Sequence, residues 1–199
     1  PIIMANVIKL RKGLDVNLKG KAAKEEFQVK KPAVYALVPD DFTGMKPKVV
    51  VKENDVVKVG DSLFVDKNHP EIKFVSPVSG RVTMVERGDR RKVLSVRVEA
   101  DAEQQYVDFG KKNVGQMTAQ EVKDLLLESG LFGFFRQRPY DVTANPSDTP
   151  KAIFVSAFNS MPLAADFEYV LRGREADFQA GLDALAKMAK TYLGVSSKQ

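Results

Sequence analysis

Short runs of β-branched and aromatic residues alternate with turn-forming residues between positions 47 and 98. The first two runs, Val49–Val51 and Val56–Val59, are separated by Glu53-Asn54-Asp55. Three more runs follow the same pattern, at Leu63–Val65, Phe74–Val75 and Val82–Val85. Strands of about four to six residues, built on such runs and separated by Gly, Pro, Asn and Asp, are typical of a small sandwich or barrel. The pattern therefore predicts an all-β unit.

The turn residues of this unit support the same prediction. Gly60 and Gly80 can supply the positive φ of tight turns, and Pro77 cannot donate to a central sheet ladder. The phrases VKVGDSLF (57–64) and SPVSGRV (76–82) resemble those of barrel-sandwich (biotinyl/lipoyl-like) domains. We therefore expect a barrel-sandwich unit, which by itself says little about function.

The chain before this unit divides into three pieces. Val7–Asp15 alternates apolar and polar residues and reaches a turn residue at Gly13, which favours a strand followed by a turn. Residues 19–32 are polar and rich in lysine, so we expect an exposed loop. Val34–Val38 is predicted to be a strand.

The pattern changes from strand-like to helical after residues 100–108. Thr118 and Glu121 have the spacing of a capping box, in which each side chain bonds the backbone of the other residue. The leucine-rich face that follows ends at Gly130, a residue type common just after a helix. This stretch therefore predicts a helix with both ends marked.

The remaining elements suggest the start of an α/β layer. Residues 151–157 form a compact apolar run of the buried-strand type, and the apolar spacing over 174–193 predicts a last helix. Because so few strands are present, we expect an incomplete α/β region whose missing strands lie beyond residue 199. The predicted class is α+β, with a β-rich region at 1–108 and an incomplete, Rossmann-like α/β region at 109–199.

The composition removes several kinds of chemistry. The 199 residues contain no cysteine and one histidine, His69. Disulfides, thiolate metal sites, a cysteine nucleophile, a cysteine-held iron–sulfur cluster and a two-histidine metal site are therefore excluded within this chain. A Ser-His-Asp triad is not supported, because the one histidine lies in a predicted turn. Four acids in turns lack the ligand spacing of a calcium loop and are expected to be solvated: Glu53, Asp55, Asp61 and Asp66.

The net charge of +5 is modest, and the basic residues gather at 19–24, 30–31 and 87–92. These groups fit either a solvated surface or contact with a membrane surface or an acidic partner subunit. Nucleic-acid binding is disfavoured because no binding motif or interleaved exposed aromatics accompany them. No apolar run approaches the roughly 20 residues that a membrane-spanning helix needs.

Five segments together resemble one family, the A subunits of the sodium-translocating NADH:quinone oxidoreductases. They are IKLRKGLDVNLKG (8–20), the two phrases of the β-rich unit, ESGLFGFFRQRPYD (128–141) and KAIFVSAFNSMPLAAD (151–166). The resemblance covers nearly the whole chain. Members of the family are roughly twice as long, so the resemblance implies an amino-terminal portion.

The resemblance implies a peripheral subunit, without transmembrane helices of its own, on the cytoplasmic side of the cell membrane. The complex oxidises NADH, reduces quinone and exports sodium, and its membrane subunits would be the partners. No cofactor is expected in this chain, since the flavins and the iron–sulfur centre belong to other subunits. An assembly and docking role, without redox activity of its own, is the function implied.

The segment 131–140 contains the candidate site. Distant flavin-binding relatives have a glycine-rich loop here, but only Gly130 and Gly133 remain, and Asn159–Pro162 replaces their acidic residues. Both departures argue against a flavin or NADH site. An apolar pocket with convergent cations would suit a quinone, and its candidate residues are Phe132, Phe134, Phe135, Arg136, Arg138 and Tyr140. The alternative is that the phenylalanines are core and the arginines pair with nearby acids.

Two other functions remain open at this point. Lys67 stands where a lipoyl or biotinyl domain carries its acceptor lysine, which would make the chain a carrier. The turn that follows, Asn68-His69-Pro70, looks longer than a carrier's hairpin tip, and His69 is expected to be exposed in it. The second alternative is an independent soluble enzyme, for which the sequence supplies no catalytic set.

Overall fold

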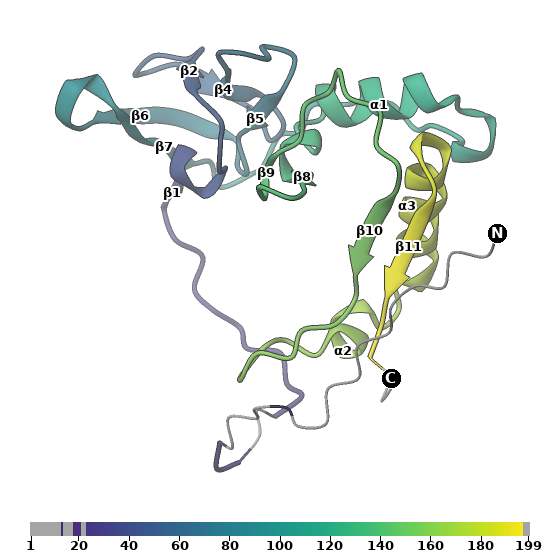
Figure 1. The fold of residues 1–199 in the computed structure, drawn as a ribbon. Coiled ribbons are helices and arrows are strands. Elements are labelled where there is room, and N and C mark those ends of the chain that lie inside the picture. Colours follow the sequence, from purple (N-terminus) through teal and green to yellow (C-terminus); the bar gives the residue numbers. More distant parts are fainter. Residues whose placement is uncertain (1–12, 14–17, 21–22, 197–199) are drawn as a thin grey trace.

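The computed structural model describes residue 13, residues 18–20 and residues 23–196 (Figure 1). The strand predicted at Val7–Asp15 falls outside the described residues, apart from Gly13. The described part of the predicted loop at 19–32 is exposed and has no helix or strand, as predicted.

Seven described strands build the β-rich unit. Four form a sheet in the order β1-β7-β6-β3 and three form a second sheet in the order β2-β4-β5, with every neighbouring pair antiparallel. The strands are β1 (Val34–Leu37), β2 (Pro47–Val49), β3 (Val56–Val57), β4 (Ser62–Asp66), β5 (Lys73–Val75), β6 (Gly80–Arg87) and β7 (Val93–Ala100). The strands predicted between 34 and 98 are therefore present, most within two residues of their expected bounds.

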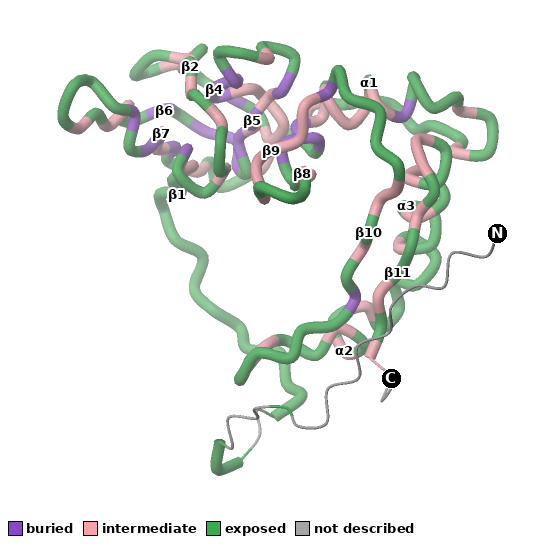
Figure 2. Tube along the Cα trace, viewed as in Figure 1, coloured by how far each residue is buried: buried purple, intermediate pink, exposed green. Residues whose placement is uncertain are grey.

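The core of the barrel is drawn from both sheets. Leu63 and Phe64 on β4 are fully buried, as are Val82 on β6 and Val96 on β7. Figure 2 shows this buried stretch along β4, β6 and β7. Removing these side chains from water is the main favourable contribution to the free energy of folding. The inward-facing apolar residues that predicted the strands are thus the residues that hold them together.

Gly80 is needed because β6 and β7 come very close at its position. A Cβ atom there would lie 1.8 Å from the backbone oxygen of Glu99, and the φ of Gly80 is +156°. Gly60 also has positive φ, at +99°, where the chain passes close to the ring of Phe109. Both glycines were expected to have positive φ, and both do.

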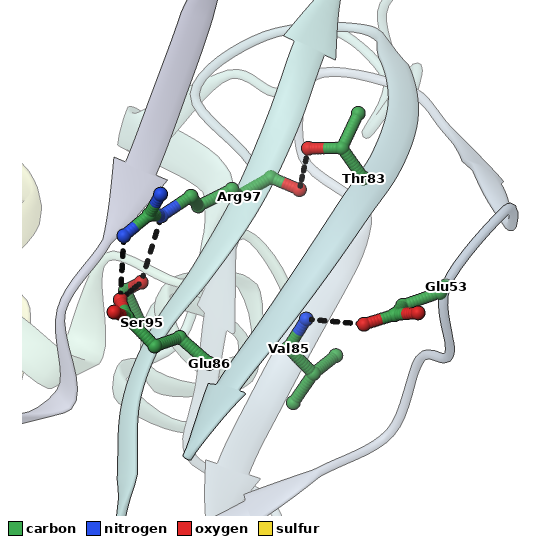
Figure 3. Close-up of polar contacts among 6 residues, drawn as sticks. All are labelled: Glu53, Thr83, Val85, Glu86, Ser95 and Arg97. Atoms are coloured by element: carbon green, nitrogen blue, oxygen red, sulfur yellow. Dashed lines mark hydrogen bonds and ion pairs between the residues drawn. The ribbon is translucent and has the colours of Figure 1, made fainter. Parts of the chain in front are cut away.

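A cluster of three polar side chains, Glu86, Ser95 and Arg97, links the long strands β6 and β7 (Figure 3). Arg97 donates from Nη2 to Glu86 Oε2 at 2.7 Å, and the Ser95 hydroxyl donates to the same oxygen at 2.7 Å. These bonds favour the charged carboxylate and lower the pKa of Glu86, the Ser95 hydroxyl contributing most. On the neighbouring turn, Glu53 accepts from the backbone N–H of Val85.

The described part of the second region contains three α-helices and four strands. They are α1 (Ala119–Glu128), β8 (Arg136–Gln137), β9 (Val142–Thr143), β10 (Ile153–Ser156), α2 (Phe167–Leu171), α3 (Glu175–Met188) and β11 (Thr191–Gly194). α1 packs against α3, and α3 lies along the β10–β11 pair (Figure 1). A mixed helix and strand layer follows the barrel, so the predicted class, α+β, is confirmed.

The start of α1 agrees with its prediction in detail. The Thr118 hydroxyl accepts from the backbone N–H of Glu121 at 3.2 Å, and the Glu121 carboxylate accepts from the backbone N–H of Thr118 at 2.8 Å. The second bond is the main reason that the pKa of Glu121 is lowered. Gly130, with φ of +76°, follows the helix as predicted.

The prediction of one helix over 174–193 is wrong at its end. α3 stops at Met188, and Ala189 is extended, with φ of −160° and ψ of 167°. Tyr192 and Leu193 belong instead to β11, which pairs in parallel with β10 from Ile153 opposite Thr191. Ladder hydrogen bonds to β10 decide the outcome here, and helical spacing alone cannot reveal them.

The strand predicted at 151–157 is present as β10, but its expected burial on both faces is wrong. Phe154 is 79% exposed because α3 covers only the opposite face of the two-stranded sheet. Figure 2 shows exposed and half-buried residues along β10 and β11. An apolar run indicates that a strand faces something apolar, without showing which element supplies it.

Candidate functional site

The segment 131–145 lies against the barrel rather than apart from it. Phe132 is buried and belongs to the same core cluster as Phe64 and Phe74. The backbone N–H of Thr143, on β9, donates to the backbone oxygen of Thr43 in the barrel at 2.8 Å. The candidate residues, on the β8–β9 hairpin and in the turn before it, therefore belong to a segment that is fixed to the β-rich unit.

The four aromatic candidates divide into an inner and an outer pair. Phe132 and the half-buried Phe135 lie against each other, with ring centroids 5.4 Å apart, and pack against the barrel core. Phe134 is 68% exposed and Tyr140 is 83% exposed. The rings of Phe134 and Phe42 meet edge to face with centroids 5.7 Å apart. Only the outer pair presents surface to a ligand.

The two arginine candidates converge on one acid. Arg136 Nε lies 3.5 Å from Asp141 Oδ1, and Arg138 Nη1 lies 3.9 Å from the same oxygen. Asp141 has a φ of +53°, which aspartate tolerates better than most residues, and it closes the turn between β8 and β9. Because these groups are well exposed, each ion pair adds little stability.

The two glycines of the segment face barrel side chains. A Cβ at Gly133 would lie 2.7 Å from Phe74 Cε1, and a Cβ at Gly130 would lie 2.6 Å from Val75 Cγ1. Packing thus accounts for both glycines, and the space that a phosphate would need beside them is filled by protein. The residues present do not fit a flavin cradle. Met161 and Asn159, where the flavin-binding relatives place acids, lie in an exposed loop.

Lys67 lies in the turn between β4 and β5, which spans residues 67–72. Its backbone N–H donates to the oxygen of Lys46 at 2.7 Å. The buried Asp66 beside it accepts from the backbone N–H of Asn68 at 3.0 Å and that of Lys46 at 3.3 Å. The turn is thus hydrogen-bonded to the segment just before β2, unlike the free hairpin tip of a carrier domain.

The remaining polar candidates have structural partners. His69 Nδ1 lies 3.7 Å from Glu71 Oε1 in the Lys67 turn, where it is half-buried rather than fully exposed. Asp55 accepts from the backbone N–H of Lys52 at 2.9 Å, and Asp61 accepts from that of Lys58 at 2.6 Å. These acids fix turns. Among the described residues no group of three or more His, Cys, Asp and Glu side chains is arranged to hold a metal.

An exposed pair of aromatic residues on β10 and β11 is not predicted from the sequence. The rings of Phe154 and Tyr192 stack with centroids 5.2 Å apart, and Lys190 Nζ lies 5.0 Å from the Tyr192 centroid. The opposite side of β10, at Val155, lines a pocket of about 310 Å³ together with residues of α1 and α3. The signal that could have revealed the pair is the β-prone Thr191-Tyr192-Leu193 directly after α3.

A larger groove, of about 1,010 Å³, lies between α3 and the segment before α1. It is lined by Lys111, Lys112 and Lys187, and Lys187 Nζ donates to the backbone oxygen of Gly115 at 3.1 Å. None of the six candidate residues lines this groove or the smaller pocket. The exposed candidates therefore lie outside both, on the β8–β9 hairpin and the turn before it.

A barrel of two antiparallel sheets, followed by an α/β layer docked onto it through the aromatic segment before β8, defines the class: a barrel-sandwich hybrid domain with an attached α/β domain. Family models agree in both parts. Residues 8–101 match the "NqrA N-terminal barrel-sandwich hybrid domain", and residues 117–199 match the "NqrA second alpha/beta domain". The chain belongs to the NqrA family.

Individual relatives match over most of the chain. It is 35% identical over 190 residues to the A subunit of the Na⁺-translocating NADH-quinone reductase of Pseudomonas aeruginosa (strain UCBPP-PA14), covering 94% of this chain and 42% of that protein. Identity is 36% to the corresponding protein of Yersinia pseudotuberculosis (serotype O:1b) and 37% to that of Serratia proteamaculans, each over 92% of this chain and 41% of the relative. The chain thus spans about two fifths of these proteins' length. No described helix is long and apolar enough to cross a bilayer.

Proposed function

We propose that the chain is the amino-terminal portion of a peripheral subunit, on the cytoplasmic side of the membrane, of a Na⁺-translocating NADH-quinone reductase. Its role is assembly and docking, and its partners are the other subunits of that complex. The observation that carries the proposal is the identity of 35–37% over 92–94% of the chain to proteins of that name. The redox groups of the complex belong to its other subunits, which agrees with the packed surroundings of Gly130 and Gly133.

The exposed face of β10 and β11 supports the docking role. Phe154 and Tyr192 present a stacked aromatic surface on a sheet of two strands, which is too small to be stable by itself. We propose that further strands of the same subunit extend this sheet. Relatives more than twice as long as the matched region have the residues to supply them.

A quinone contact belongs to the same proposal. The exposed candidates are Phe134, in the turn before β8, and Arg136, Arg138 and Tyr140 of the β8–β9 hairpin, which together combine apolar surface with cations. Phe132 and Phe135 serve beneath them as packing. In the assembled complex a quinone photoaffinity label is expected on 128–166, with less labelling in a Tyr140→Ala variant. A label found only outside that range would remove the quinone contact and leave the docking role intact.

Deletion of the whole subunit from a host that contains the complex tests the main proposal. We expect sodium-dependent NADH:quinone activity in the membranes to be lost and to return when the full subunit is supplied from a plasmid. Membranes that retained this activity after the deletion would contradict the proposal. A tagged subunit should also co-purify with the membrane subunits.

Two simple measurements separate the alternatives. A lipoyl or biotinyl mass increment on Lys67, in protein from the native host, would identify a carrier. Turnover by the purified chain alone would identify an independent enzyme. We expect an unmodified mass and no turnover.

A further inference from the structure

The hairpin that joins β6 and β7 projects from the barrel on the side away from the second region (Figure 1). Five of its six tip residues are charged, and four of those are cations: Arg87, Asp89, Arg90, Arg91 and Lys92. All five are exposed, as Figure 2 shows for the hairpin end. We call residues 87–92 the basic tip.

The backbone of the basic tip is unfavourable for the residues that it carries. The N–H of Lys92 donates to the oxygen of Asp89 at 3.1 Å, and the two residues between them both have positive φ, 54° at Arg90 and 60° at Arg91. This is the geometry of a type I′ hairpin turn, which Asn-Gly fills most easily. Residues without a special tolerance for positive φ are disfavoured in it. Two arginines in the two least suitable positions indicate a role outside the turn.

The arginines of the basic tip form no ion pair with the described residues, so they can bind an external anion. Lys92 Nζ pairs with Asp40 Oδ2 at 2.5 Å, but across the described residues no acid lies within ion-pair distance of Arg87, Arg90 or Arg91. Arg87 instead donates to the backbone oxygen of Arg91 at 3.3 Å. Leu94, 38% exposed, adds an apolar side chain next to these cations.

We propose that the basic tip binds the headgroups of anionic phospholipids. A projecting, convex hairpin can reach a flat surface, and neither of the two pockets described above borders it. Guanidinium groups bind phosphodiesters through paired hydrogen bonds, and an anionic membrane attracts nearby cations over about a Debye length. The inference rests on the proposed function only in that it places a membrane close to the chain.

The test uses the purified 199-residue chain and vesicles of phosphatidylcholine, alone or with about a third phosphatidylglycerol. We expect binding to the anionic vesicles that weakens as salt is raised. The double variant Arg90→Asn/Arg91→Gly removes two cations and supplies the residues that the turn prefers. Because each cation is worth about fivefold in binding, the variant is expected to bind on the order of 25-fold more weakly. Its unfolding temperature should stay equal or rise, so lost binding cannot be ascribed to misfolding.

A variant with the same net charge is the matched control. Lys30→Gln/Lys31→Gln also removes two cations, from the exposed segment before β1. We expect it to keep most of the vesicle binding. An equal loss in both variants would show that net charge alone governs binding and would overturn the proposal. A tip variant that unfolded at a lower temperature would overturn the argument from turn geometry.

Failure of this inference can be distinguished from failure of the proposed function. A parent chain that does not prefer anionic vesicles would overturn lipid binding. If the tip variant then reduced co-purification with the membrane subunits, an acidic protein surface would be the partner. Conversely, vesicle binding that persists in a chain unable to co-purify with those subunits would support the basic tip and contradict the docking role.

Discussion

Gly133 shows how closely the second region approaches the barrel. The space for a side chain at this position is occupied by the ring of Phe74. Gly181, in the middle of α3, has no heavy atom within 4 Å of its would-be Cβ. The two glycines are therefore present for different reasons, and they provide a matched pair for testing whether the turn that leads into β8 is packed on the barrel.

The substitution Gly133→Ala is expected to lower the free energy of unfolding by about 1–3 kcal/mol, because Phe74 must move to admit the methyl group. Gly181→Ala should raise it by about 0.5–1 kcal/mol, since alanine is the better helix former. Both values are obtained from urea denaturation. Equal effects of the two substitutions would contradict the close packing at Gly133.

Glu86 offers a pH-dependent test of the polar cluster on the β6–β7 ladder. Its carboxyl should titrate below 4.5 in the folded chain, and Ser95→Ala should raise the pKa because the hydroxyl is the main cause of the shift. A folded pKa below the unfolded one stabilises the chain above the unfolded pKa, and this stabilisation is lost as the pH falls through the folded pKa. Carboxyl NMR of parent and variant measures the shift. If the pKa of Glu86 were the same in the variant as in the parent, the Ser95 hydroxyl would not be the cause of its lowering.

At the scale of elements, α1 is the part that sequence predicts best. The N-terminal cap, the apolar face and Gly130 all come from contacts within a few residues, and such contacts can be read from spacing. β11 is the opposite case. Thr191–Gly194 becomes a strand because β10, far back along the chain, offers a parallel ladder. Local spacing contains no information about that partner.

The capping box of α1 should have a measurable effect. Thr118→Ala removes the acceptor for the backbone N–H of Glu121 and is expected to cost about 0.5–2 kcal/mol of stability. Thr118→Ser keeps a hydroxyl in the same place and should cost much less. Thermal unfolding followed by circular dichroism compares them. If serine were as costly as alanine, the hydroxyl would not be what stabilises the helix start.

At the scale of the whole molecule, the two regions share one hydrophobic core at Phe132. The aromatic segment was predicted either as a pocket for quinone or as core with paired arginines. Composition could not separate these, because inward and outward phenylalanines look alike in a sequence. The structure places Phe132 and Phe135 inward, Phe134 and Tyr140 outward, and both arginines beside Asp141. Binding of quinone at the outer pair stays a prediction.

Phe132→Ala is expected to destabilise the chain by about 3–5 kcal/mol, since it opens a cavity where the second region meets the barrel. The neighbouring substitution Phe134→Ala removes a mostly exposed ring and should cost less than about 1.5 kcal/mol. Hydrogen exchange should show the loss of protection in Phe132→Ala spreading to β5 of the barrel. Protection lost only within the second region would contradict a shared core.

The antiparallel pairing of β1 with β7 has a consequence during synthesis. Val34 pairs with Glu99, so β1 leaves the ribosome well before its partner, the last strand of the barrel to be made. Until then its backbone groups are unpaired and available to other chains. Lys30, Lys31 and Pro32 stand directly before it, and charges and proline at such a place hinder aggregation. Because β1 remains the outermost described strand of its sheet after β7 has paired with it, we expect the lysines and the proline before it to hinder unwanted strand pairing both during synthesis and in the folded chain.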